Sequence, residues 1–170
     1  LGGPAGFYLR APVSTTLIFD HNIVRGNESG RPGVGVSGGG VHLHLETATM
    51  TFTNNIVVGN QAIGPYANGG GMDLSVNAGG TCDIHNNVFA DNTAQQHGGG
   101  IQLLLAVNIS RAVLAGNLFV NNQAGPGASE GSGGGLMLNA ECQVNLVNNT
   151  FRGNTADDAG GLGYYCEGTA

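Results

Sequence analysis

Apolar and polar residues alternate in short stretches that recur along the whole chain. One set of stretches follows a cluster of glycines, and its apolar residues stand two apart, as in Val41, Leu43 and Leu45. Alternation with a period of two indicates a β-strand with one buried face. The equivalent positions in later copies are Met72, Leu74, Val76; Ile101, Leu103, Leu105; and Leu136, Leu138, Ala140.

Two further strands are predicted on either side of a repeated asparagine. Before Asn55 the apolar residues Met50 and Phe52 stand two apart, and Val57 follows Asn55 at the same spacing. The same arrangement surrounds the other leading asparagines, which follow one another at intervals of 30 to 33 residues: Asn22, Asn55, Asn87, Asn117 and Asn149. Each copy of the repeat therefore contains three short strands.

A period of this size is typical of a solenoid, in which each repeat packs on the one before it. The chain is predicted to be an all-β protein, a parallel β-helix of about five to six coils with three short strands per coil, in one domain over residues 1–170. An α-solenoid is excluded because the repeats alternate with a period of two. A leucine-rich repeat is excluded because its leucine spacing is absent.

A second asparagine follows the first by five residues in every copy. These asparagines are Asn27, Asn60, Asn92, Asn122 and Asn154. In a stack of coils, equivalent asparagines lie above one another, so both sets are expected to form ladders of hydrogen-bonded side-chain amides. Asparagine and glycine also tolerate the left-handed backbone of a tight bend, which places both at corners of the coil.

The segments between the second asparagine and the next glycine cluster vary in length. They cover residues 28–37, 61–68, 93–97, 123–132 and 155–159, and they are expected to be surface loops at one corner. His97 and the acidic pair Asp157-Asp158 lie in these segments, and no role is predicted for them.

Charge excludes several classes of partner. Only 9% of the residues are charged, lysine is absent and the formal net charge is -6. Nucleic acids and anionic membranes require clustered basic residues, so neither is predicted to bind. No apolar run reaches the length of a transmembrane helix, and membrane insertion is not expected.

The ends of the chain carry no predicted helical cap. The chain begins with Leu1 inside a partial repeat, and Tyr164-Tyr165-Cys166 has the pattern of another strand. Uncapped strand edges favour pairing with another chain. We therefore expect an excerpt or subunit of a longer assembly, with either continuation of the chain or end-to-end association of copies.

The three cysteines show no paired metal-binding spacing. Cys82 falls in an apolar column and is predicted to be buried, whereas Cys142 and Cys166 stand in successive repeats and form a candidate disulfide. A zinc site is disfavoured because there is no CxxC pair. No metal and no cofactor is predicted.

The combination of Gly-Gly-Gly-aliphatic with Phe-x-x-Asn resembles the paired motifs of polymorphic outer-membrane protein repeats. It is also similar to the pectate-lyase-like β-helix repeats of bacterial surface proteins. The motif is complete at 89–92, 119–122 and 151–154, whereas Val24 and Val57 replace the phenylalanine in the first two copies. The resemblance implies right-handed coiling, secretion and a place on a bacterial cell surface. It implies no catalytic residue.

Candidate chemistry lies on the outward face of the strand that follows the glycines. Outward positions on neighbouring coils bring together a candidate patch of Arg10, His42, His44 and Asp73. A carboxylate beside imidazoles is suited to acid–base chemistry, and an arginine can hold a uronate carboxylate. The same residues are also typical of a solvated sheet face, and no complete catalytic motif is present.

These observations leave three hypotheses for function. The first is a non-enzymatic, secreted β-helix module at the cell surface, which acts as a stalk, an adhesin segment or a self-assembling fibre subunit. The second is a carbohydrate-active enzyme, a polysaccharide lyase or hydrolase that uses the candidate patch. The third is a glycan-binding module in which Tyr8 or Tyr165 stacks on sugar rings.

Overall fold

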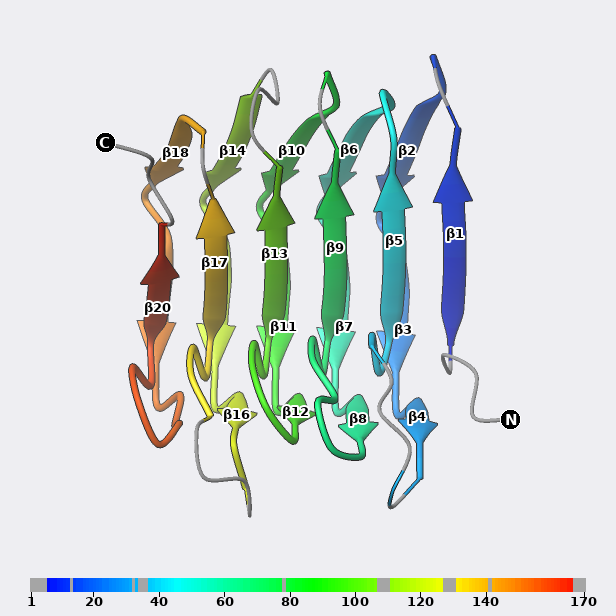
Figure 1. The fold of residues 1–170 in the computed structure, drawn as a ribbon. Coiled ribbons are helices and arrows are strands. Elements are labelled where there is room, and N and C mark those ends of the chain that lie inside the picture. The colour runs from blue at the N-terminus through cyan, green and yellow to red at the C-terminus, as the bar shows by residue number, and fades with distance from the viewer. Residues whose placement is uncertain are drawn as a thin grey trace.

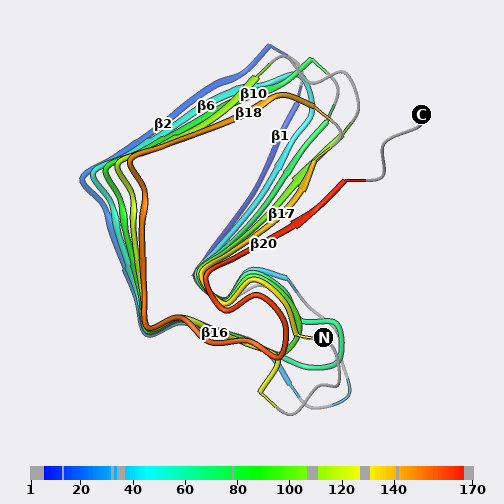
Figure 2. The same ribbon diagram turned by 90° about the vertical axis from the view of Figure 1, so that its left-hand side faces the viewer.

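The computed structural model describes residues 6–12, 14–31, 33, 37–77, 79–106, 111–126, 131–140 and 142–166. Within these ranges the chain forms 20 strands and no helix, and all pairings between strands are parallel. Successive coils lie side by side along one axis (Figure 1), and a view along that axis shows them superposed (Figure 2). The predicted all-β parallel solenoid is therefore confirmed.

Four sheets run along the axis, and we name them sheets A to D. Sheet A consists of β1 (Phe7–Ala11), β5 (Val41–Leu45), β9 (Met72–Val76), β13 (Ile101–Leu105), β17 (Leu136–Ala140) and β20 (Leu162–Tyr165). Sheet B consists of β2 (Thr16–Asp20), β6 (Thr49–Thr53), β10 (Thr81–His85), β14 (Arg111–Ala115) and β18 (Val144–Val147). Sheet C consists of β3 (Ile23–Arg25), β7 (Ile56–Val58), β11 (Val88–Ala90), β15 (Leu118–Val120) and β19 (Thr150–Arg152). Sheet D consists of β4 (Glu28–Gly30), β8 (Gln61–Ile63), β12 (Thr93–Ala94) and β16 (Gln123–Ala124).

Sheet D corrects the prediction of three strands per coil. Its strands lie in segments that were expected to be loops, and each strand places one small side chain inward: Ser29, Ala62, Ala94 or Ala124. A single inward residue gives no alternation, which is why the pattern did not reveal the strand. Four coils contain all four strands, slightly fewer than the five to six expected. Among the described residues, the fifth coil has three strands and β20 alone belongs to a sixth.

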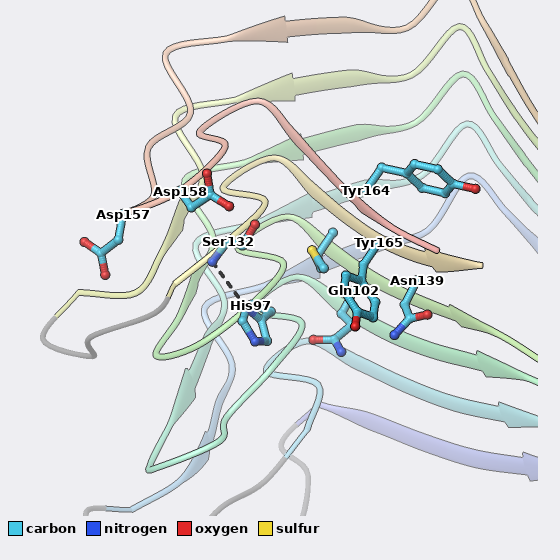
Figure 3. Close-up of a pocket in the computed structure, with 9 residues that line it drawn as sticks. His97, Gln102, Ser132, Asn139, Asp157, Asp158, Tyr164 and Tyr165 are labelled. Carbon is cyan, nitrogen blue, oxygen red and sulfur yellow. Dashed lines mark hydrogen bonds between the residues drawn. The ribbon is translucent and has the colours of Figure 1, made fainter. Parts of the chain in front are cut away.

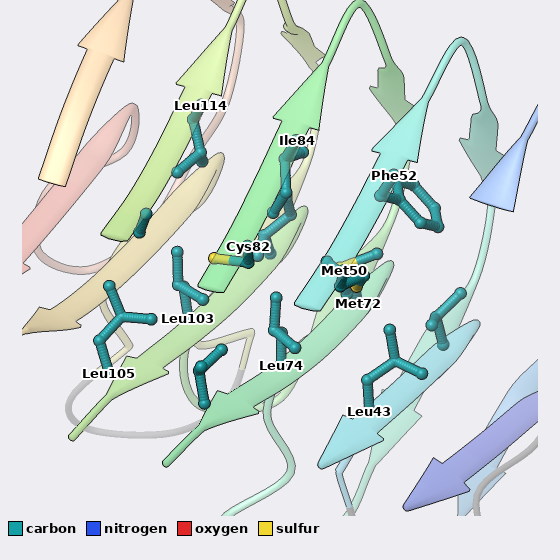
Figure 4. Packing of buried hydrophobic residues seen from close by; sticks show 14 of the residues in the cluster. Leu43, Met50, Phe52, Met72, Leu74, Cys82, Ile84, Leu103, Leu105 and Leu114 are labelled. Atoms are coloured by element: carbon teal, nitrogen blue, oxygen red, sulfur yellow. The ribbon is translucent and has the colours of Figure 1, made fainter. Parts of the chain in front are cut away.

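The interior of the solenoid is filled by the inward residues of sheets A, B and C. Leu43, Leu74 and Leu103 lie at equivalent positions of sheet A, and each is fully buried (Figure 4). Cys82 of sheet B is also fully buried among these side chains, as predicted. Because equivalent positions are stacked, each side chain packs on its counterparts in the neighbouring coils.

Each coil contributes one phenylalanine to a stack that runs along the axis. In the second coil the positions on either side of the asparagine are Phe52 and Val57, and in the third coil they are Ile84 and Phe89. The ring centroids of Phe52 and Phe89 are 6.2 Å apart, and those of Phe89 and Phe119 are 5.2 Å apart. The aromatic ring thus changes from sheet B to sheet C between these coils, so the volume inside each coil stays similar. This exchange accounts for the valines that interrupt the Phe-x-x-Asn motif.

The leading asparagines form a buried ladder, as predicted. The Nδ2 group of Asn87 donates to Oδ1 of Asn117 at 2.9 Å and to the carbonyl oxygen of Phe52 at 2.8 Å. Its Oδ1 accepts from the backbone N–H of Asn55 at 2.8 Å and from Nδ2 of Asn55 at 3.1 Å. All four hydrogen-bonding positions of the buried amide are therefore satisfied.

The second set of asparagines repeats this arrangement at the next corner. Asn92 donates from Nδ2 to Oδ1 of Asn122 at 2.9 Å and to the carbonyl oxygen of Val57 at 2.9 Å. Its Oδ1 accepts from the backbone N–H and from Nδ2 of Asn60, both at 3.0 Å. The two ladders thus fix both ends of every strand in sheet C.

The left-handed backbone lies one residue before each ladder asparagine, not at the asparagine as we expected. The φ angle is 55° at Asn54, 56° at Asn86 and 65° at Gly116. This division leaves the ladder side chain in an ordinary backbone conformation, while its neighbour makes the bend. At the third corner the same role belongs to the first glycine of each three-glycine cluster, such as Gly69 with a φ of 64°, and to Ala159 with a φ of 50° in the last copy.

The second glycine of each cluster answers a different requirement. A Cβ atom at Gly70 would overlap the backbone of Thr93 in the next coil. The glycine cluster therefore combines a left-handed bend at its first residue with a close approach of backbones at its second.

Cys142 and Cys166, the candidate disulfide pair, are free thiols in the structure. Cys142 follows β17 and is half-buried, whereas Cys166 follows β20 on the neighbouring coil and is exposed. Burial raises the pKa of Cys82 to about 12, which keeps this thiol protonated and unreactive at neutral pH.

Replacing one ladder residue is expected to be costly. The change Asn87→Ala leaves the amide of Asn55 and the carbonyl of Phe52 without their partners inside the protein. We expect a loss of about 3 kcal/mol in the free energy of unfolding, measured by urea denaturation. Asn145→Ala is the control, because Asn145 is exposed on the outer face of sheet B. An equal effect of both changes would contradict the ladder as the source of stability.

Candidate ligand-binding groove

The outer face of sheet A presents two columns of side chains. In the first column Tyr8, His42, Asp73, Gln102, Met137 and Gly163 are paired in register. The second column holds Arg10, His44, Ser75, Leu104, Asn139 and Tyr165. Neighbouring members of a column lie about 4.8 Å apart, the spacing between paired strands.

A third column runs beside the first, on the segment that leads from sheet D into sheet A. It consists of the residue three positions before the last glycine of each cluster: Ser37, Asn68, His97, Ser132 and Asp158. Figure 2 shows that this segment curls outward before the chain enters sheet A. We call the space between the first and third columns the groove.

Hydrogen bonds along the third column hold it in place. The backbone N–H of His97 donates to Oδ1 of Asn68 at 3.0 Å, and the backbone N–H of Ser132 donates to Nδ1 of His97 at 3.2 Å. Because Nδ1 of His97 accepts a hydrogen bond, the neutral ring carries its proton on Nε2. In both hydrogen bonds a backbone N–H group of one coil donates to a side chain of the coil before it, and this fixes the positions of the Asn68 and His97 side chains.

Part of the groove is a hollow of about 560 Å³. Its lining comes from several coils and is mostly polar, with two tyrosines and one methionine (Figure 3). The lining residues are His97, Gln102, Ser132, Met137, Asn139, Asp157, Asp158, Tyr164 and Tyr165. A second hollow of about 300 Å³ lies beside His44, Asn77 and Leu104, and Asn139 borders both.

Asp73 and Gln102 lie at the floor of the groove and are buried, although they occupy outward positions of the sheet. The side chain of Asp73 is 5% exposed, and Gln102 is 7% exposed. Within the described part of the chain, neither Oδ1 of Asp73 nor Oε1 of Gln102 has a hydrogen-bond partner. Burial raises the pKa of Asp73 to about 6, and a hydrogen bond from Ser37 opposes this rise.

The structure brings His42 and Asp73 of the candidate patch together. Nε2 of His42 lies 3.8 Å from Oδ2 of Asp73, and the ring of Tyr8 packs edge-on against His42 with centroids 5.1 Å apart. Burial and the nearby His44 lower the pKa of His42, which favours the neutral imidazole. The pair is thus a half-buried histidine next to a buried carboxyl group.

Arg10 and His44 lie in the second column and do not join this pair. The guanidinium of Arg10 forms an ion pair with Glu46, in which Nε lies 3.1 Å from Oε1. Nε2 of His44 lies 3.5 Å from Nδ2 of Asn77. The candidate patch is therefore split between two columns, and its arginine is engaged by a carboxylate that the sequence analysis did not consider.

Three groove residues were missed by the sequence analysis: His97, Asp157 and Asp158. They lie in segments of variable length, where no position can be compared from copy to copy by counting from the asparagines. A signal was present nonetheless, because a polar residue stands three positions before the last glycine of each cluster. Counting backward from the glycines would have placed Ser132 and Asp158 in one column with His97.

The described residues contain no group of three or more His, Cys, Asp or Glu side chains that could hold a metal ion. Among them there is also no helix with the length and apolar character needed to cross a membrane. The groove therefore offers hydrogen bonds, carboxylates and aromatic faces as its means of recognition.

The buried carboxyl group of Asp73 is expected to make stability depend on pH. Its pKa is about 6 in the folded chain against an ordinary value of 3.8, so the folded state holds the proton more tightly. The contribution of Asp73 to stability should be greatest below pH 4 and should fall by about 3 kcal/mol as the pH rises to 6 and above. Asp73→Asn should remove most of this fall, as measured by denaturation at pH 4, 6 and 8. The exposed Asp158→Asn is the control, and identical pH profiles for both variants would contradict the assignment.

The chain matches no protein-family model, and neither the curated proteins nor the solved structures yielded a match. The architecture is that of a parallel β-solenoid with asparagine ladders. The functional argument rests on the residues of the groove.

Proposed function

We propose that this chain is an adhesive β-solenoid module that acts outside the cell and binds glycans in the groove of sheet A. The observation that carries the proposal is the hollow of about 560 Å³, which combines amide, hydroxyl and carboxylate groups with tyrosine rings. Sugars are bound by this combination, since their hydroxyls need hydrogen-bond partners and their C–H faces pack on aromatic rings.

The positions of Tyr165 and Asn139 support this proposal. They are paired neighbours in the second column, and both line the hollow together with Gln102 of the first column. Tyr165 is 51% exposed, so its ring is accessible to a ligand. An aromatic platform beside amide groups from rigid strands is a preorganised surface for a sugar chain.

The rigid solenoid suits a role in adhesion. Outward positions of sheet A recur along the axis at about 4.8 Å, which provides an extended surface for an extended polymer. The resemblance of the glycine and asparagine motifs to polymorphic outer-membrane protein repeats and pectate-lyase-like surface proteins supports a bacterial surface as the location. This finer kinship is part of the proposal.

Asp73 and Asp158 lie too far apart to form the carboxyl pair of a glycosidase. Asp73 lies on β9, and Asp158 precedes β20, so three strand spacings, or about 14 Å along the axis, separate them. Glycosidases hold their two carboxyl groups about 5 to 9.5 Å apart. The arginine that a lyase would need for a uronate is held by Glu46 instead.

Loss of the tyrosine platform is expected to weaken glycan binding. Tyr165→Ala should lower the affinity for bound oligosaccharides by about tenfold, since ring stacking contributes roughly 1 to 2 kcal/mol. A glycan array followed by calorimetry on the best ligand would measure this change. Asn145→Ala, on the outer face of sheet B, should bind as the parent does. Release of new reducing ends or unsaturated sugars during incubation would instead show an enzyme.

End-to-end association of copies is a second candidate property, favoured by an apolar hollow at the first coil. A hollow of about 250 Å³ there is lined by Phe7, Phe19, Val24 and Phe52, together with other residues. We expect sedimentation of the purified chain to show species larger than a monomer, and Phe19→Lys to reduce them. Monomers alone at all protein concentrations would remove this property and leave glycan binding untouched.

A further inference from the structure

The groove carries negative charge on the side that faces a ligand. Asp157 and Asp158 line the hollow and are exposed, and Asp73 lies one strand behind Gln102 at its floor. No arginine of the described residues lines the hollow, and the chain contains no lysine. The groove therefore repels anions and attracts cations.

Two of the arginines are held in ion pairs away from this charge. Arg10 is bound to Glu46, and Arg111 on sheet B donates to both carboxylate oxygens of Asp83 at 2.8 and 3.0 Å. Both ion pairs lie outside the set of residues that lines the hollow. The carboxyl groups of the groove thus have no arginine or lysine beside them in the lining of the hollow.

A second observation, independent of charge, points to a ligand that donates hydrogen bonds. Oε1 of Gln102 and Oδ1 of Asp73 are both buried without a hydrogen-bond partner among the described residues. The two residues are paired in register on β13 and β9, so their acceptors lie in neighbouring strands. Buried acceptors of this kind are costly unless a donor reaches them.

We propose, on the basis of the proposed glycan-binding function, that the groove selects glycans with protonated amino groups. An ammonium group offers three donors and no acceptor, which suits the acceptor of Gln102 at the floor. Its charge interacts favourably with Asp157 and Asp158 at the rim and with Asp73 behind the floor. Tyr165 lies beside the same hollow, and its ring face attracts a cation as well as a sugar ring.

Other glycan classes fit the groove less well. A uronate would place its carboxylate against the carboxylates of Asp157 and Asp158, with no arginine or lysine in the lining to bind it. A neutral sugar can donate a hydroxyl to Gln102, but it gains nothing from the charge of the groove. A comparison of a neutral oligosaccharide with an amino-bearing one therefore measures how much the charge of the groove contributes to binding.

The test compares two oligosaccharides of equal length and linkage. Glucosamine oligomers carry protonated amines, whereas the nitrogen atoms of N-acetylglucosamine oligomers are neutral amides. Calorimetry at pH 6 and low salt gives both dissociation constants. We expect the glucosamine oligomer to bind about tenfold more tightly, with an advantage that shrinks as salt is added. A galacturonate oligomer of the same length should bind more weakly than either.

Variants locate the preference in the groove. The double variant Asp157→Asn/Asp158→Asn changes two exposed side chains, and it should reduce the tenfold preference to about threefold or less. Gln102→Glu should increase the preference. The matched control is Asp91→Asn, an exposed aspartate at the sheet C corner where asparagine also occurs, and it should leave both affinities unchanged.

The outcomes separate this inference from the proposed function. Equal affinity for the two oligomers overturns the amine preference and leaves glycan binding in place. An undiminished preference in the double variant overturns its assignment to this groove. Binding of neither oligomer nor any array glycan, by a protein with an intact β-sheet circular dichroism spectrum, overturns both.

Discussion

Buried polar groups at the corners of the coil have no partners within their own coil. The amide of Asn87 takes its partners from the coil before it and the coil after it, and Asn92 does the same at the next corner. A single coil would therefore leave these groups without protein partners, whereas a stack both buries and satisfies them except at its ends. This requirement sets the register between neighbouring coils without a shift of even one residue. In that register the apolar residues inside the solenoid lie above one another and pack.

Much of the fold could be predicted because the register between coils requires the same residue types to recur at intervals of 30 to 33 residues. The alternation in Val41–Leu45 predicted sheet A, and the repeated asparagines predicted both ladders. The fourth sheet could not be predicted, since a strand such as β12 turns one alanine inward and has no alternation to detect. The exchange of phenylalanine between sheets B and C was hidden for a similar reason. Each column alone varies between phenylalanine and a smaller aliphatic residue, and only the two columns together show one phenylalanine in every coil.

The site was predicted in part, and the limit is physical. The outward columns follow from strand register, so the proximity of His42 and Asp73 could be expected. The burial of Asp73 could not, because a separate segment beside the sheet covers it and that segment has no constant length. The ion pair of Arg10 could not be expected either, because its partner Glu46 lies just beyond the end of β5, where the alternation that defines a column has stopped.

The ladders also make one coil equivalent to another. Every ladder bond joins the same atom types in neighbouring coils, so a stretch of 30 to 33 residues can be removed or duplicated between equivalent asparagines without leaving a mismatched surface. Such a change would lengthen or shorten the groove by one strand spacing and leave its cross-section as it was. The reach of the groove and its chemistry are thereby independent variables, the first set by the number of coils and the second by the few side chains that each coil presents.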